Sequence, residues 1–351
     1  MHFKKAWVLS ALLAIIVLFQ QCSKKDAAVV TDTTLTPKLP ATAYNYIPVY
    51  PAFIQAALSV NDNTPADNAI SNDGATLGRV LFYDKQLSKN NTVSCGSCHK
   101  PETSFSDDAI LSKGFNAGLT NRHSMALVNV RFYKSGKMFW DERAPSLEKQ
   151  VLQPIQNTTE MGLTLSELEN KVKNLPYYPS LFQKAFGSTQ IDSVKIAKAV
   201  AQFIRSIVTF QSKYDQVKQG LATFTADEAA GENLFLTGAA NSCGGCHRPP
   251  MFTQPEPVIP FGFPDPTDAG INNQNRFKSG SLRNIALTAP YFHNGKVASL
   301  TVMLNGGPPG SPTHVPAHSV APQDAPRILA FLQTLTDNSI ATDIKFADPF
   351  K

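Results

Sequence analysis

The sequence has few cysteines, no long apolar run and no strong excess of charge. Only five cysteines occur among 351 residues, and four of them fall in two short motifs. The longest nearly apolar run, residues 6–19, is shorter than the roughly 20 residues that a transmembrane helix needs. The formal net charge of +5 includes Lys4 and Lys5, which would leave with an N-terminal leader. We therefore predict neither nucleic-acid binding nor a polybasic membrane surface.

The two cysteine motifs are Cys95-Gly96-Ser97-Cys98-His99 and Cys243-Gly244-Gly245-Cys246-His247. Two thiols at this spacing can add to the two vinyl groups of one porphyrin, and the adjacent imidazole can then bind the iron. Zinc sites, thioredoxin-like couples and disulfides also use Cys-x-x-Cys pairs. None of these explains a histidine after each second cysteine, and no βαβ pattern surrounds either motif. The sequence thus predicts two covalently bound haem c groups and a redox function.

The fifth cysteine, Cys22, follows the apolar run within Phe19-Gln20-Gln21-Cys22-Ser23, which is similar to a lipobox. We expect residues 1–22 to be a lipoprotein signal peptide with Cys22 lipidated, and residues 23–43 to be a flexible tether. An ordinary signal peptide or an uncleaved anchor are the alternatives. All three readings export the protein, and the first predicts a periplasmic protein anchored to the membrane by lipid.

An internal repeat accompanies the two motifs. Gly78-x-x-Leu81-Phe82 precedes the first motif and Gly231-x-x-Leu234-Phe235 precedes the second. Such self-similarity predicts a duplicated unit. We therefore expect a mostly α fold with long irregular loops and two cytochrome c-like domains, residues 44–215 and 216–351.

Other segments also predict helices. Thr164 with Glu167, and Thr225 with Glu228, are typical of capping boxes. A long amphipathic helix is predicted over residues 191–208, and a closing helix over residues 325–335. The apolar face of the first consists of Val194, Ala197, Val200, Ala201, Ile204 and Val208. Strand content should be low, and the proline-rich residues 249–266 and 308–326 should form loops.

Five further motifs make the chain resemble the bacterial di-haem cytochrome c peroxidases and their MauG-type relatives, from about Thr76 to Thr336. The motifs are Leu77-Gly78-x-x-Leu81-Phe82-x-Asp84-x-x-Leu87-Ser88, Arg122-His123-Ser124-Met125-Ala126-Leu127-Val128-Asn129, Phe139-Trp140-Asp141-x-Arg143-Ala144, Pro154-Ile155-Gln156-Asn157 with Glu160-Met161-Gly162, and Ser281-Leu282-Arg283-Asn284-Ile285-Ala286-Leu287-Thr288-Ala289-Pro290-Tyr291-Phe292-His293-Asn294-Gly295.

The resemblance implies that the two haems have different functions. The haem held by Cys95, Cys98 and His99 would bind and cleave hydrogen peroxide. The haem held by Cys243, Cys246 and His247 would accept electrons from a small cytochrome c or another redox protein. Trp140 matches the tryptophan that lies between the haems in this family, although an isolated reading of a buried tryptophan is core packing.

The resemblance also implies a catalytic pair for the cleavage of peroxide. Glu160 matches the distal glutamate, which would move a proton between the two oxygens, and Gln150 matches the distal glutamine, which would hydrogen-bond the bound oxygen species. Without the motif context, Glu160 would be read as a solvent-exposed loop acid.

Two departures concern histidine and calcium. Relatives that need prior reduction carry a blocking histidine after the first haem motif, whereas residues 100–121 contain none. We therefore expect activity without reductive activation, with His123 as the nearest rival ligand. His123 stands where the family has an asparagine that helps to bind calcium beside the carbonyls matching Thr288 and Pro290. Imidazole is a poor ligand for a hard cation, which argues against calcium here.

A third departure concerns the far side of the second haem. The family places a methionine or tyrosine ligand where this chain has Gly307. Met303 is the replacement that we predict, because a thioether raises the potential of a haem. The alternatives are that Met303 is a core residue, or that His314 or His318 is the ligand.

The sequence as a whole favours an exported di-haem peroxidase that reduces hydrogen peroxide to water. One alternative is a MauG-like oxidase acting on a protein or an organic molecule. The other is an electron carrier without turnover, which the pair Glu160 and Gln150 argues against. Family resemblance also suggests a homodimer.

Overall fold

The computed structural model describes residues 35–237, 243–254, 267–306 and 320–351. The segment Thr36–Lys351 forms one compact unit. Cys22, most of the predicted tether, Gly307, His314 and His318 lie outside the described residues.

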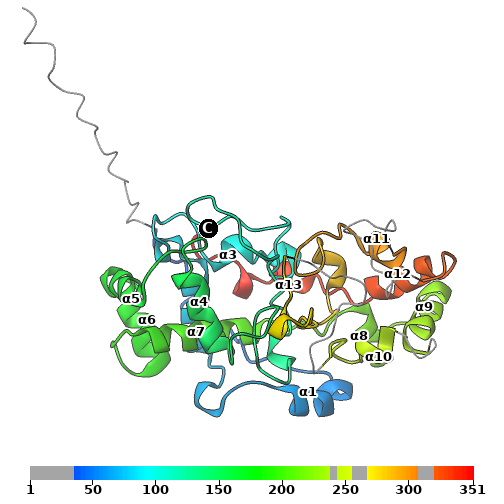
Figure 1. Ribbon diagram of the computed structural model, residues 1–351. Helices are drawn as coiled ribbons and strands as arrows, with labels where there is room; N and C mark the ends of the chain where they lie inside the picture. Colours follow the sequence, from blue (N-terminus) through cyan, green and yellow to red (C-terminus); the bar gives the residue numbers. More distant parts are fainter. Residues whose placement is uncertain (1–34, 238–242, 255–266, 307–319) are drawn as a thin grey trace, which may run out of the picture. The chain divides into compact units, whose positions relative to one another are not determined.

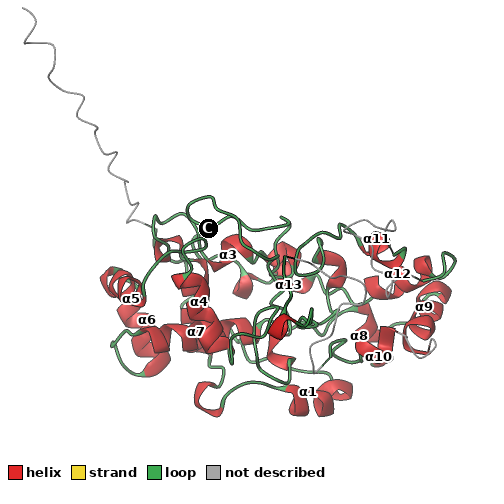
Figure 2. Ribbon diagram, viewed as in Figure 1, coloured by secondary structure: helices red, strands yellow, loops and turns green. Residues whose placement is uncertain are grey.

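Helices and irregular loops make up the described chain, which contains isolated β-bridges and no strand (Figures 1 and 2). The α-helices are α1 Gln55–Asn61, α2 Asn72–Tyr83, α3 Cys95–Cys98, α4 Leu147–Gln156, α5 Leu165–Asn174, α6 Tyr178–Phe186, α7 Ser193–Ser206, α8 Lys213–Lys218, α9 Ala226–Thr237, α10 Cys243–Cys246, α11 Leu300–Leu304, α12 Ala325–Gln333 and α13 Ser339–Thr342. Short 3₁₀ turns span Ala52–Ile54, Ala66–Asn68, Lys85–Leu87, Pro101–Thr103, Val130–Phe132, Ile271–Asn273, Ile285–Leu287 and Ile344–Phe346. The predicted mostly α fold is confirmed. No helix within these ranges is long and apolar enough to cross a bilayer.

The helix starts follow from local capping. At α5, the Thr164 side chain and the Glu167 carboxylate cap each other's backbone amides, as the sequence predicts. At α9, the Thr225 amide donates to Glu228 Oε2 at 2.7 Å, and the Glu228 amide donates to Thr225 Oγ1 at 3.3 Å. Both predicted capping boxes are therefore confirmed, and each satisfies amides that a helix start leaves without partners.

The predicted long helix and closing helix correspond to α7 and α12. Most of the predicted apolar face of α7 is buried, including Ala197, Val200 and Ile204. Val194 lies in the first turn and is 59% exposed, and Val208, which is half-buried, lies beyond the end of α7.

The internal repeat appears as two helix crossings, α2 on α7 and α9 on α12. A Cβ added to Gly78 would lie 2.0 Å from the carbonyl oxygen of Ala199, and one added to Gly231 would lie 2.0 Å from that of Arg327. Both crossings therefore require glycine, because the two backbones approach too closely for any side chain.

Two main apolar clusters surround these crossings. The first includes α2, α4, α6 and α7, and the second includes α9, α11 and α12. The chain end returns to the first cluster, where Phe346 is buried and its carbonyl accepts a 2.6 Å hydrogen bond from the hydroxyl of Tyr83. The division into residues 44–215 and 216–351 stays a prediction.

Candidate haem and peroxide site

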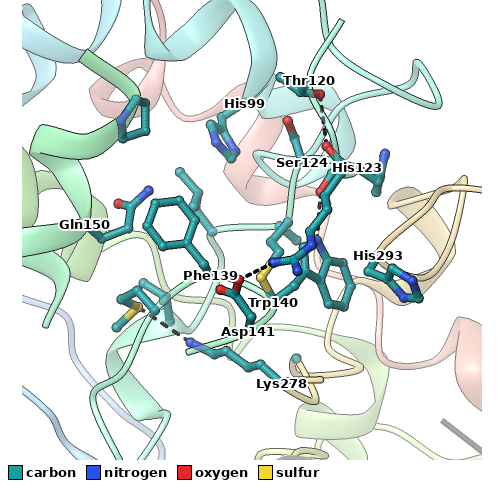
Figure 3. A pocket seen from close by; sticks show the side chains of 18 of the residues that line it. His99, Thr120, His123, Ser124, Phe139, Trp140, Asp141, Gln150, Lys278 and His293 are labelled. Atoms are coloured by element: carbon teal, nitrogen blue, oxygen red, sulfur yellow. Dashed lines mark hydrogen bonds and ion pairs between the residues drawn. The ribbon is translucent and has the colours of Figure 1, made fainter. Parts of the chain in front are cut away.

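A cavity of about 870 Å³ lies at the centre of the site (Figure 3). Residues from both halves of the chain line it, among them His99, Trp140, Gln150, Glu160, Lys278 and His293. Its volume is in the range of known cofactor and ligand cavities.

His99 is oriented for iron binding. Its Nδ1 lies 2.8 Å from the carbonyl oxygen of Phe105, and a backbone carbonyl can only accept, so Nδ1 carries the proton. Nε2 is then the nitrogen that a metal would use, with Phe105 as its outer-shell support. Burial lowers the pKa of His99, which also favours the neutral, ligating form.

The cysteines of the first motif fit the same group. Cys95 and Cys98 lie at the two ends of α3, and neither forms a disulfide. Two thiols, an oriented imidazole and an adjoining cavity fit a covalently attached haem.

The second motif repeats this local structure. The amide of His247 donates to the carbonyl of Cys243 at 2.7 Å, as that of His99 donates to Cys95 at 2.9 Å. In the loops that follow, Phe105 and Phe252 are both fully buried with left-handed φ angles of 59° and 52°. The duplication therefore extends to the backbone around both haem motifs.

Glu160 and Gln150 line the cavity together with His99. Gln150 lies on α4, and Glu160 lies in the turn after it, where its amide donates to the Asn157 carbonyl at 3.1 Å. Burial raises the pKa of Glu160, while the charge of Arg143 acts in the opposite direction. Glu160 is therefore a partly buried acid that faces the haem cavity, which is unlike the loop acid that an isolated reading would give.

Trp140 connects the two halves of the chain. Its Nε1 donates to the carbonyl of His123 at 2.8 Å, and its ring meets that of His293 edge-on at 6.4 Å. The His293 ring in turn stacks on Phe277 at 3.8 Å. Figure 3 shows Trp140 and His293 side by side.

Comparison with known proteins gives consistent results. Residues 72–223 match the family model described as di-haem cytochrome c peroxidase. The chain is 32% identical to cytochrome c551 peroxidase of Nitrosomonas europaea over 291 residues, which cover 75% of this chain and 80% of that protein. The chain belongs to the di-haem cytochrome c peroxidase family. As a member of this family, it carries two covalently bound c-type haems.

Other members of this family are also similar. The methylamine utilization protein MauG of Methylorubrum extorquens is 30% identical over 289 residues, which cover 77% of this chain and 80% of that protein. A crystal structure of a MauG-like protein associated with microbial copper homeostasis has a TM-score of 0.75 at 29% identity, covering 88% of this chain and all of that chain. The diheme peroxidase BthA of Burkholderia thailandensis, with a TM-score of 0.66 at 20% identity, shares the fold.

His123 departs from the family motif, and the structure shows what its side chain contacts. Nε2 lies 3.2 Å from Ser106 Oγ, and Nδ1 lies 3.1 Å from the carbonyl oxygen of Ala109 and 3.2 Å from that of Ile110. Within the described residues, no group of three or more His, Cys, Asp or Glu side chains could hold a metal ion. The expectation that the carbonyls of Thr288 and Pro290 do not bind calcium here stays a prediction.

Met303 lies on α11, where it is half-buried and packs against the second apolar cluster. Its role as the axial ligand of the second haem of this di-haem protein stays a prediction.

Sequence reasoning missed two charged groups of the cavity. Lys278 is only 5% exposed, and burial lowers its pKa to about 7. Arg122 forms ion pairs with Asp141 at 2.7 Å and with Asp268 at 2.6 Å, and the second pair joins residues far apart in the sequence. No local pattern in this di-haem protein marks Lys278 as buried or predicts the ion pairs of Arg122, because only tertiary contacts bring these groups to the cavity.

Proposed function

We propose that the protein is an exported, periplasmic cytochrome c peroxidase that reduces hydrogen peroxide to water with electrons from a small cytochrome c or another redox protein. The observation that carries this proposal is the placement of Glu160 and Gln150 in the same cavity as His99. An electron carrier without turnover has no use for an acid and an amide beside its iron.

The reaction consumes one hydrogen peroxide, two electrons and two protons and yields two waters. The haem held by Cys95, Cys98 and His99 would supply the site where peroxide binds and where electrons reach it. Glu160 accepts the proton from one peroxide oxygen and delivers it to the other, which then leaves as water. The side-chain amide of Gln150 donates a hydrogen bond to the bound oxygen and stabilises charge that develops there.

A carboxyl with a raised pKa suits this role. General acid-base catalysis is most efficient when the pKa of the group lies near the working pH. Burial moves the pKa of Glu160 in that direction, and the nearby Arg143 limits the shift so that the carboxylate form stays accessible.

Electron supply would use the second haem, held by Cys243, Cys246 and His247. Trp140 supports this route, because its indole contacts the backbone of His123 and the ring of His293, which follows the second haem motif in the sequence. The donor class is supported by the relatives that are named cytochrome c551 peroxidase.

The test is peroxide-dependent oxidation of reduced cytochrome c by the fully oxidised holoprotein. We expect prompt turnover in the wild type and a loss of about 10²-fold or more in Glu160→Gln. Glu102→Gln is the matched control, because Glu102 does not line the cavity, and it should keep wild-type turnover. Equal rates in all three proteins would contradict the proposed role of Glu160.

A MauG-like oxidase is the second candidate, favoured by the similarity to the MauG-like crystal structure along its whole length. It predicts rapid reaction with peroxide but negligible oxidation of reduced cytochrome c, with electrons taken from another protein or an organic molecule. Measuring peroxide consumption with and without the reduced cytochrome therefore separates the two candidates.

A further inference from the structure

Tyr133 and Glu142 form a buried phenol and carboxylate pair beside the haem cavity. The Tyr133 hydroxyl donates to Glu142 Oε1 at 2.5 Å. Tyr133 is 3% exposed, and the Glu142 side chain is 7% exposed. Tyr133 lines the same cavity as His99 and Trp140. A side chain that is oxidised at this position would therefore be close enough to take part in electron transfer in the haem cavity.

The backbone of Glu142 is unusual. Its φ angle of 55° lies in the left-handed region, which non-glycine residues rarely adopt. The matching turn of the second repeat, between the bridged residues Tyr291 and Val297, has Gly295 at φ 63° in the corresponding place. The turn therefore does not need a side chain at this position. Because the left-handed backbone of Glu142 is strained, we infer that its carboxylate has a function.

The Glu142 carboxylate also contacts a cation and a second hydrogen-bond donor. Lys137 Nζ lies 3.7 Å from Glu142 Oε2, and the hydroxyl of Ser135 donates to Oε1 at 3.2 Å. Lys278 Nζ lies 3.9 Å from the centre of the Tyr133 ring. The carboxylate thus has an adjacent cation and a second donor, and it remains able to accept the phenolic proton.

We propose that Tyr133 is a proton-coupled redox station, oxidised during peroxide reduction, with Glu142 as the acceptor of its proton. This inference rests on the proposed peroxidase function. In the forward step, the phenol gives one of the two electrons that peroxide consumes, and its proton moves to the Glu142 carboxylate. The products are a neutral tyrosyl radical and a protonated Glu142. An electron from the donor then regenerates the phenol as the proton returns from Glu142.

Tyr133 combines a carboxylate acceptor with a place in the cavity lining. The buried Tyr178 also donates to a carboxylate, that of Asp84, but it does not line the cavity. Tyr83 packs against Gly96 in α3, yet its hydroxyl donates to the backbone carbonyl of Phe346. A carbonyl oxygen is too weak a base to take a phenolic proton, whereas a carboxylate is an ordinary acceptor. Tyr83 is therefore the matched control, since it is buried beside the first haem motif without a carboxylate.

The experiment uses oxidised holoprotein containing ring-deuterated tyrosine, mixed with one equivalent of hydrogen peroxide, freeze-quenched and examined by electron paramagnetic resonance. We expect a radical signal that narrows on ring deuteration in the wild type and in Tyr83→Phe. The signal should be absent in Tyr133→Phe, and its rate of formation should fall about 10²-fold in Glu142→Gln.

Glu142→Gly separates a redox role from a structural one. Glycine fits the left-handed backbone, which offsets part of the stability lost with the carboxylate contacts. This variant should therefore stay folded with both haems attached and still lose the radical signal. A tyrosyl signal that persists in Tyr133→Phe would overturn the inference. Peroxide consumption without a tyrosyl signal in the wild type would overturn it while leaving the peroxidase function intact. Failure of the wild type to consume peroxide would overturn both.

Discussion

The indole Nε1 of Trp140 donates a 2.8 Å hydrogen bond to the backbone carbonyl of His123. The amide of His123 donates in turn to the carbonyl of His293 at 2.7 Å. His123 therefore holds the indole ring of Trp140 and also bonds to the backbone of His293, in the motif of residues 281–295.

Trp140→Phe should keep an aromatic ring but lose this hydrogen bond. We expect electron transfer between the haems to slow about tenfold or more, as one hydrogen bond that fixes the ring is lost. The measurement is stopped-flow reduction of the haem held by Cys95 and Cys98 after electrons enter at the haem held by Cys243 and Cys246. Tyr46→Phe, which removes a hydrogen bond from Tyr46 to the Lys345 carbonyl in the first apolar cluster, is the control and should leave the rate unchanged.

The pH profile of turnover should report Glu160. Burial raises the pKa of Glu160 above its ordinary value of 4.5. In the proposed mechanism the carboxylate accepts a proton from peroxide, so turnover should fall as the pH drops through this raised pKa. The acid limb of turnover should therefore lie above pH 4.5. Arg143→Leu removes the charge that lowers the pKa, so its acid limb should move to higher pH; an unmoved limb would argue against Glu160 as the titrating group.

The helix crossing at Gly78 should not tolerate a methyl group. Gly78→Ala would place a Cβ against the carbonyl of Ala199, and we expect a loss of about 1–3 kcal/mol in the free energy of unfolding. Denaturant titration of Gly78→Ala beside the wild type tests this, and equal stabilities would show that the two helices can move apart.

The ion pair of Glu148 and Arg205 should make stability depend on pH. Burial acts to raise the pKa of Glu148, but hydrogen bonds and charge from Arg205 outweigh it and lower the pKa from 4.5 to about 2. A lowered carboxyl pKa stabilises the fold above the unfolded value and loses this effect as the pH falls. We expect the wild type to lose about 3 kcal/mol between pH 4.5 and 2 through this group.

Glu148→Gln supplies the comparison for this ion pair. The variant should be less stable at neutral pH, because Arg205 is 1% exposed and would lose its charge partner. Its stability should vary less with pH over the same window. If plots of melting temperature against pH run parallel for the two proteins, another group would be responsible for the pH dependence of stability.

Removal of divalent cations should have little effect. The imidazole of His123 contacts Ser106 and two backbone carbonyls, which leaves it engaged with the protein. We expect the melting temperature and the turnover to be the same after dialysis against EDTA and after addition of calcium. A clear rise in either quantity with calcium would show that oxygen ligands near this position bind the ion.

The sequence by itself determined the haem attachment sites, the helix starts and the helical fold. These depend on local chemistry: two thiols and an imidazole within five residues, or a side chain that caps its own helix three residues later. The glycines of the two repeats were visible as a pattern, although the reason for them, the contact with Ala199 and Arg327, appeared only in the structure. Resemblance to the family singled out Glu160 and Gln150 beforehand.

Tertiary structure alone decided which groups meet in the cavity. Lys278 and Glu142 are ordinary charged residues in the sequence, since nothing local shows that the chain buries them. Burial and partners come from segments far apart in the chain, as with Arg122 and Asp268, and a pKa depends on both. Local pattern therefore specifies the sites of attachment, whereas the electrostatics that control protons and electrons arise from long-range packing.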